Sequence, residues 1–135
     1  GAYDFVVLDT APGWDALSVN ALFYAHEVLS PVSLEVMTLQ SLLDFNLSLG
    51  AIQRYHPALE LRYVLPTFFD RRVRKSAEIL RQLEVHFGPR LCEPVRYNVR
   101  LSEAPGYGQT ILEFAPQSPG ADDYRRLAER IAQDG

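Results

Sequence analysis

The sequence predicts an α/β fold in which a parallel sheet is flanked by helices. Short runs rich in β-branched and aromatic residues alternate with longer segments whose apolar residues recur at the helical spacing. Turn residues, chiefly glycine and proline, separate the two kinds of segment. This alternation is typical of βαβ units. A chain of 135 residues has the length of one domain, so we expect residues 1–135 to form a single domain.

The composition excludes several classes of protein. The chain is 47% hydrophobic, with a net charge of −4, and no apolar run approaches the roughly 18 residues of a membrane-spanning helix. The N-terminus lacks the pattern of a signal peptide, so we expect a cytoplasmic protein without membrane contacts. A single cysteine, Cys92, excludes an internal disulfide and a thiolate metal cage. The only methionine is Met37 and the chain begins at Gly1, so we expect a fragment.

The first half of the chain is predicted to contain two strands and two helices. A strand at Tyr3–Leu8 leads into Asp9 and a Pro-Gly turn. The remaining elements are a helix at Ala16–Phe23, a short strand at Glu27–Val32 stopped by Pro31, and a helix at Thr38–Tyr55 that Pro57 closes.

The second half continues the alternation and ends in a helix. The expected elements are strands at Leu61–Phe68 and Leu91–Tyr97, a helix at Ala77–Phe87, and a loop-rich tract from Asn98 to Pro119. In the final helix, Tyr124, Leu127, Ala128 and Ile131 share one face, and Ser118 is the expected N-cap.

In an open parallel sheet, ligands bind outside the carboxyl ends of the strands, and the first tract in such a position is Asp9–Gly13. An aspartate at a strand end is the arrangement by which a Walker B carboxylate holds Mg²⁺ through water. The alternative is that Asp9 satisfies the amides of the Pro-Gly turn.

Two further tracts follow predicted strands. Thr67–Lys75 places four positive charges within five residues, at the expected start of a helix. Cations there oppose the helix macrodipole, which suggests an anionic partner, although a solvated helix start is an equal alternative. Arg96–Pro105 mixes cations, an aromatic ring and an amide, a set suited to gripping phosphate or a base, or to ordinary capping.

Four segments, taken in order and spacing, carry a family resemblance. They are YDFVVLDTAPGWDALSVNAL, VLPTFFDRRVRKS, NVRLSEAPGYG and FAPQSPGADDYRRLAERI. Together they closely resemble the C-terminal half of ParA/Soj-type chromosome-partitioning ATPases, and the match spans nearly the whole chain. Because those proteins are deviant Walker A P-loop ATPases related to MinD, the resemblance implies part of a Rossmann-like P-loop NTPase sheet.

The resemblance implies roles for particular residues. Asp9 corresponds to the Walker B aspartate that holds Mg²⁺ through water, and Asp9–Pro12 to the switch that senses the γ-phosphate. The implied catalytic residues are Asp9 and Pro12, and the implied nucleotide contacts are Asp9, Thr67, Asp70 and Asn98. Arg72 and Arg100 match arginines that bind DNA without sequence preference, and the neighbouring Arg71, Arg74 and Lys75 are expected to join them.

The resemblance also implies a function for the complete protein. It would bind ATP and Mg²⁺, dimerise, bind nucleoid DNA without sequence preference, and be released when a ParB-type partner stimulates hydrolysis. Two alternatives remain open: a MinD-like or orphan ParA protein that positions another cargo, and a DNA- or partner-binding module without catalysis.

The chain departs from the family pattern at several points. Asp15 replaces the usual glycine of the switch, Gly13 replaces a serine, and Arg96-Tyr97 replaces Pro-Arg. The sequence contains no G-x-x-x-x-G-K-[ST] motif and only one lysine. We therefore expect this chain alone neither to bind ATP tightly nor to hydrolyse it.

The missing P-loop strand would lie between the Asp9 strand and the next one in the family's sheet. Two outcomes are expected for the sheet of this chain. Either Tyr3–Asp9 pairs directly with Glu27–Val32, or exposed sheet edges recruit another chain. We favour a strand-swapped or edge-paired homodimer.

Overall fold

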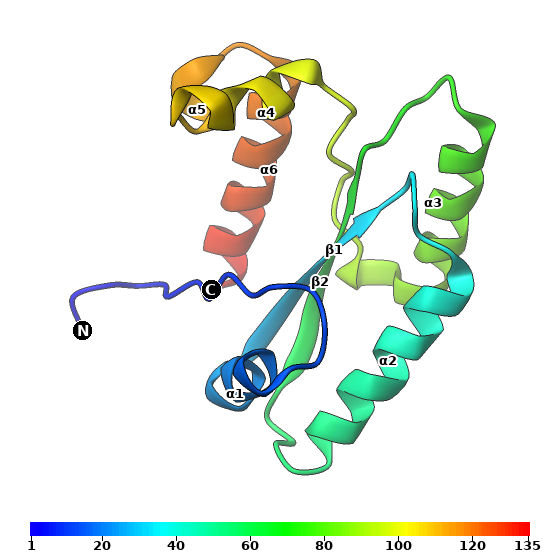
Figure 1. The fold of residues 1–135 in the computed structure, drawn as a ribbon, viewed down its shortest axis with the longest axis vertical. Helices are drawn as coiled ribbons and strands as arrows, with labels where there is room; N and C mark the ends of the chain where they lie inside the picture. Colours follow the sequence, from blue (N-terminus) through cyan, green and yellow to red (C-terminus); the bar gives the residue numbers. More distant parts are fainter.

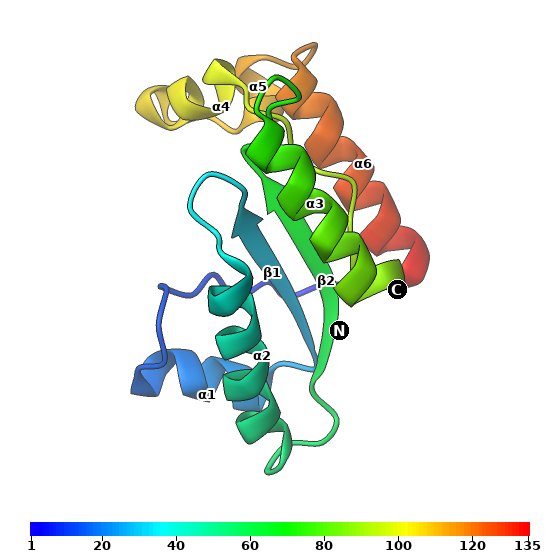
Figure 2. The same ribbon diagram turned by 90° about the vertical axis from the view of Figure 1, so that its right-hand side faces the viewer.

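The computed structural model describes residues 1–135, apart from the side chain of Leu39, and confirms the α/β class. Two parallel strands form the sheet, and helices cover both of its faces (Figures 1 and 2). In chain order the elements are α1 (Ala16–Tyr24), β1 (Glu27–Ser33), α2 (Leu39–Gln53), β2 (Glu60–Thr67), α3 (Arg74–Phe87), the 3₁₀ turn η1 (Gly88–Arg90), α4 (Val99–Glu103), the 3₁₀ turn η2 (Ala104–Tyr107), α5 (Ile111–Phe114) and α6 (Pro119–Asp134).

The two faces of β2 enter separate cores. The strand register shifts between Val28 and Leu29 of β1 and leaves Arg62 of β2 without a partner, so the alternation of side chains is interrupted there and resumes from Tyr63. Leu61 and Val64 join the larger cluster, which contains Leu42 and Leu49 of α2 and Leu83 of α3. On the other face lie Tyr63 and Leu65 with Cys92 and Val95, covered by Tyr124, Leu127 and Ile131 of α6. This two-sided burial explains why the β2 segment is almost continuously apolar.

The predicted strand at Tyr3–Leu8 is not formed, and its proposed pairing with β1 is absent from the described residues. Residues 3–8 are exposed, with Tyr3 at 82% and Val7 at 88% of their full accessibility. The segment runs past the C-terminus, where the Phe5 ring lies beside Gly135, and then descends to α1 (Figure 1). A strand requires a neighbouring strand to satisfy its backbone groups, and none in the described residues lies along this segment.

Pro31 does not stop β1, which continues to Ser33. Proline is tolerated here because the described sheet places β2 on only one side of β1, so a missing N–H on the other side breaks no ladder. The predicted strand at Leu91–Tyr97 is an extended segment that makes only two isolated bridges, Val64 with Leu91 and Phe69 with Arg96. Two prolines, Pro66 and Pro94, remove backbone donors from this part of the chain and keep the ladder discontinuous.

The boundaries of the remaining helices follow local chemistry. α3 begins at Arg74 rather than at Ala77, while α2 ends at Gln53. Within the tract expected to be loop-rich, α4, η2 and α5 are short helical turns. Ser118 caps α6 as predicted, since its hydroxyl accepts a hydrogen bond from the Ala121 amide at 3.2 Å.

Candidate nucleic-acid interface at the carboxyl edge of the sheet

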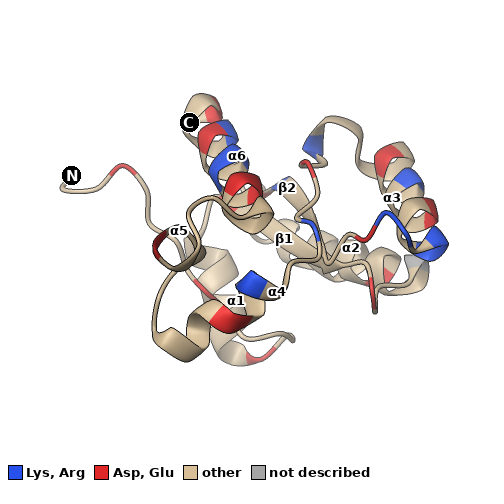
Figure 3. Ribbon diagram, turned by 90° about the horizontal axis from the view of Figure 1, so that it is seen from above, with Lys and Arg blue, Asp and Glu red and all other residues tan. Residues whose placement is uncertain are grey.

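Two of the three candidate tracts meet at the carboxyl end of β2. The Phe69 amide donates to the Val95 carbonyl at 3.1 Å, and the Tyr97 amide donates to the Phe69 carbonyl at 2.8 Å. These bonds hold Thr67–Asp70 beside the segment that leads to Asn98, and the two segments run parallel. Figure 3 looks onto this edge of the sheet, with the loop that enters α3 and the short helix α4 both in view.

The loop after β2 is organised by the carboxylate of Asp70. Its Oδ1 accepts hydrogen bonds from the Arg72 amide and from Arg72 Nε, both at 3.0 Å, and its Oδ2 accepts one from Arg72 Nη2 at 2.9 Å. The side chain of Arg72 remains 85% exposed, whereas that of Asp70 is 23% exposed. The hydrogen bonds from the Arg72 side chain, followed by the one from its amide, lower the pKa of Asp70.

The start of α3 collects further positive charge. Arg71, Arg74 and Lys75 are exposed, and no ion pair joins them to a carboxylate within the described part of the chain. α3 has Val73 at its N-cap position, with no side-chain cap and no acidic residue in its first turn. The macrodipole and these cations therefore repel one another, and an anion bound here would relieve that repulsion.

The second basic position lies on α4. Asn98 caps this helix by accepting a hydrogen bond from the Arg100 amide at 2.9 Å, and Arg100 pairs with Glu103 at 3.2 Å. Close packing fixes α4 against α6, because a Cβ added at Gly120 would lie 2.8 Å from Cγ of Leu101. We call the cations at this end of the sheet, Arg71, Arg72, Arg74, Lys75 and Arg100, the basic edge.

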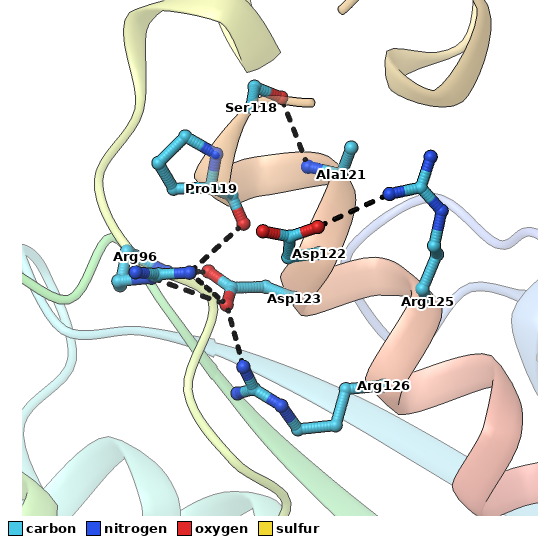
Figure 4. Close-up of polar contacts among 8 residues, drawn as sticks. All are labelled: Arg96, Ser118, Pro119, Ala121, Asp122, Asp123, Arg125 and Arg126. Carbon is cyan, nitrogen blue, oxygen red and sulfur yellow. Dashed lines mark hydrogen bonds and ion pairs between the residues drawn. The ribbon is translucent and has the colours of Figure 1, made fainter. Parts of the chain in front are cut away.

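A buried carboxylate that sequence reasoning missed anchors the segment before Asn98 (Figure 4). The side chain of Asp123 is 1% exposed and accepts from the Arg96 amide at 2.9 Å and from Arg96 Nη2 at 2.9 Å, while Arg126 approaches it at 3.5 Å. The hydrogen bond to Asp123 raises the pKa of Arg96. Asp123 was not identified from the sequence, because its partner Arg96 is 27 positions away in the chain.

Thr67 and Asn98, both expected to contact nucleotide, are engaged within the chain. The hydroxyl of Thr67 donates to the Val32 carbonyl at 3.4 Å, and the Asn98 carbonyl oxygen caps α4. Both side chains are half-buried, in segments that lie at the carboxyl end of β2. The structure thus brings together the three nucleotide-contact candidates that follow β2.

Asp9 and Pro12 lie apart from this group. Both are exposed in the irregular segment that descends to α1, toward the opposite end of the sheet from α4 (Figure 1). The described residues contain no cluster of three or more metal-binding side chains, and the side chain of Asp9 is exposed. The residues present therefore do not by themselves fit a Mg²⁺–nucleotide site, which needs further ligands. The unusual Asp15 has a structural explanation, because it caps α1 by accepting from the Ser18 amide at 2.8 Å.

Comparison with known proteins identifies relatives of the whole chain. No protein-family model matches the sequence. The chromosome-partitioning ATPase Soj of Thermus thermophilus is 40% identical over 131 residues, which cover 96% of this chain and 53% of that protein. The chain resembles the C-terminal half of a ParA/Soj-type ATPase. The family resemblance stated from the sequence motifs is thereby confirmed.

Other ParA/Soj relatives give the same picture. The chromosome partitioning protein ParA of Caulobacter vibrioides is 31% identical over 133 residues, covering 97% of this chain and 50% of that protein. The sporulation initiation inhibitor protein Soj of Bacillus subtilis is 31% identical over 135 residues, covering 98% of this chain and 53% of that protein. The chain spans about half the length of the curated relatives it matches.

A solved structure supports the fold. The cobyrinic acid a,c-diamide synthase of Mycobacterium smegmatis superimposes with a TM-score of 0.66 at 24% identity, over 87% of this chain and 42% of that one. At that identity the likeness concerns the fold alone. Among the described helices none is both long and apolar enough to cross a membrane.

Proposed function

We propose that this chain is the C-terminal part of a ParA/Soj-type ATPase and carries contacts to DNA. The complete protein would bind ATP with Mg²⁺, form a homodimer and bind nucleoid DNA without sequence preference in the cytoplasm. A ParB-type partner would stimulate hydrolysis and release it. The names of the relatives and the position of the match support this proposal.

The observation that carries the DNA-binding role is the basic edge. The whole chain has a net charge of −4, yet the loop after β2 and the start of α3 carry four cations within five residues, and α4 carries Arg100 at the same end of the sheet (Figure 3). Phosphate contacts of this kind supply affinity without reading base sequence, because they form with any duplex. Such binding suits a protein that moves along bulk chromosomal DNA.

The proposed nucleotide contacts rest on the family resemblance and on their placement. Thr67, Asp70 and Asn98 lie together at the edge where ligands of open parallel sheets bind. Asp9 and Pro12 would reach that edge only if residues 3–8 formed a strand beside β1. We therefore propose that ordering of this segment accompanies assembly of the nucleotide site in the complete protein.

Homodimer formation is also part of the proposal. The apolar segment Tyr3–Leu8 is exposed, and the described sheet leaves one edge of β1 without a neighbour. A second copy of the chain that pairs with either feature would bury apolar surface and satisfy backbone groups together.

The test of DNA binding is its salt dependence in this chain. Affinity for a random-sequence duplex is measured across a salt series for the wild type, Arg72→Ala, Arg100→Ala and the control Arg54→Ala. Each lost phosphate contact lowers the magnitude of the log–log salt slope by about 0.9. Arg54 is exposed at the end of α2, away from the basic edge, so its removal controls for net charge.

We expect Arg72→Ala and Arg100→Ala each to weaken binding and reduce the slope, and Arg54→Ala to leave the slope unchanged. If all three variants behave alike, the basic edge is not the DNA-binding surface. If the wild type shows no salt-dependent binding even at low salt, this chain does not carry the DNA contact.

A further inference from the structure

Both arginines that the family resemblance singles out for DNA are already paired with a carboxylate of their own segment. Arg72 pairs with Asp70 at 2.9 Å, and Arg100 pairs with Glu103 at 3.2 Å. The other three cations of the basic edge have no such pairing in the part of the chain that the structure describes. Only Arg72 and Arg100 of these five cations are therefore paired within the described residues.

The Asp70–Arg72 contact uses the donors that a phosphate needs. Nε and Nη2 form one edge of the planar guanidinium, and this edge binds carboxylates and phosphates through two parallel hydrogen bonds. In the structure both donors point to the Asp70 carboxylate. A DNA phosphate that takes the same edge must displace Asp70 or bind through the remaining donors of Arg72.

The geometry makes such displacement feasible. The Asp70 side chain is mostly covered and its Oδ1 is also held by the Arg72 amide, whereas the Arg72 side chain is 85% exposed. The carboxylate is thus fixed at the turn while the guanidinium is free to move into solvent. The Arg100–Glu103 pair has a single contact and both side chains are more than a third exposed, so it is the looser of the two.

We propose that Asp70 is a positioning residue that competes with DNA phosphate for Arg72 and thereby limits the affinity of the basic edge for DNA, with Glu103 acting more weakly on Arg100. The inference rests on the proposed DNA-binding function of this surface. Competition of this kind keeps binding weak and rapidly reversible, because each phosphate contact is made at the expense of an internal one.

The experiment compares substitutions that make the same change in net charge. Asp70→Asn retains an oxygen that accepts the Arg72 amide but loses the charge that holds the guanidinium. Glu103→Gln makes the matching change on α4. The control is Glu27→Gln, which breaks the 2.8 Å pair between Glu27 and Arg62 at the amino end of the strands. Thermal unfolding followed by circular dichroism verifies that each variant is folded, and affinity for a random duplex is measured across a salt series.

We expect Asp70→Asn to bind DNA roughly 1.5- to 5-fold more tightly at low salt, the range that an exposed ion pair is worth. The magnitude of the salt slope should rise by up to about 0.9, as for one added phosphate contact. Glu103→Gln should give a smaller gain, and Glu27→Gln should leave the slope unchanged. In an Arg72→Ala background, Asp70→Asn should no longer raise the slope, which a purely structural role of Asp70 does not predict.

The outcomes separate this inference from the proposed function. If the wild type binds DNA but Asp70→Asn does not exceed Glu27→Gln, competition is refuted and the DNA-binding role stands. If Asp70→Asn binds where the wild type does not, competition is supported. If no variant binds even at low salt, the DNA-binding role of this chain fails and the inference fails with it.

Discussion

Removal of the Asp123 carboxylate tests how much stability the buried Arg96–Asp123 contact contributes. In Asp123→Ala, the Arg96 amide loses its acceptor and the Arg96 guanidinium loses contacts at 2.9 and 3.1 Å. Breaking a buried ion pair by removing one partner costs about 3–5 kcal/mol. The Arg96 side chain is 41% exposed, so water can solvate its guanidinium once the carboxylate is gone. We therefore expect Asp123→Ala to lower the free energy of unfolding by about 2–3 kcal/mol, less than the full cost of breaking a buried pair.

Urea unfolding followed by circular dichroism measures the loss, and the adjacent residue provides the control. Asp122 is also an acid in the first turn of α6, but its side chain is 57% exposed and its pair with Arg125 is a surface contact at 3.2 Å (Figure 4). Asp122→Ala should cost no more than about 1 kcal/mol. In a double-mutant cycle, Arg96→Ala and Asp123→Ala should couple by more than about 0.5 kcal/mol. Equal losses at positions 122 and 123, or strict additivity in the cycle, would refute the reasoning.

Further predictions concern other parts of the chain. Hydrogen bonds from the side chain and the amide of Arg72 lower the pKa of Asp70, so the stabilisation from their pairing is present at neutral pH and is lost as the pH falls through that lowered pKa. An NMR titration of Arg72→Ala should show the pKa of Asp70 rising toward its ordinary value but staying below it, because the backbone amide of residue 72 still donates. Gly120→Ala should destabilise by about 1–3 kcal/mol in urea unfolding, because its Cβ would meet Leu101. Gly50→Ala should stabilise by about 0.5–1 kcal/mol in the same assay, because it lies within α2 with open space around it. Calorimetric titration with Mg²⁺–ATP should show no tight binding to this chain, and sedimentation should show a homodimer that dissociates on dilution; tight ATP binding or a monomer at all concentrations would contradict these expectations.

Features set by nearby residues could be predicted from the sequence. The Ser118 cap, the apolar stripe of α6 and the end of α3 at Phe87 depend on a few adjacent positions, and each is found where the pattern placed it. The strand expected at Leu61–Phe68 is likewise found, as β2 (Glu60–Thr67). Four cations of the basic edge were visible as a charge cluster because Arg71–Lys75 is a short segment, whereas Arg100 was identified from the family resemblance.

Features set by distant residues could not be predicted in the same way. Arg96 and Asp123 are 27 positions apart, and neither one carries a local signal that identifies the other. The pairing of Arg72 with Asp70 was missed for a different reason. The two residues are close in sequence, but a hydrogen bond between side chains within one turn leaves no periodic pattern in the sequence. Asp70 was therefore assigned to nucleotide from the family motif alone.

The segment at Tyr3–Leu8 shows where a pattern stops being sufficient. Its β-branched and aromatic residues predict burial in a sheet, but they do not supply the neighbour that a strand needs. In the structure the segment is exposed, and β1 has no strand on its other side among the described residues. Two unsatisfied features of the same kind, an apolar strand sequence and an open strand edge, therefore exist in one chain. The Tyr3–Leu8 segment and the open edge of β1 do not pair with each other in the structure, so each is available to pair with additional polypeptide. If Tyr3–Leu8 became a strand of the sheet, Asp9 at its carboxyl end would lie near the nucleotide-contact candidates that follow β2.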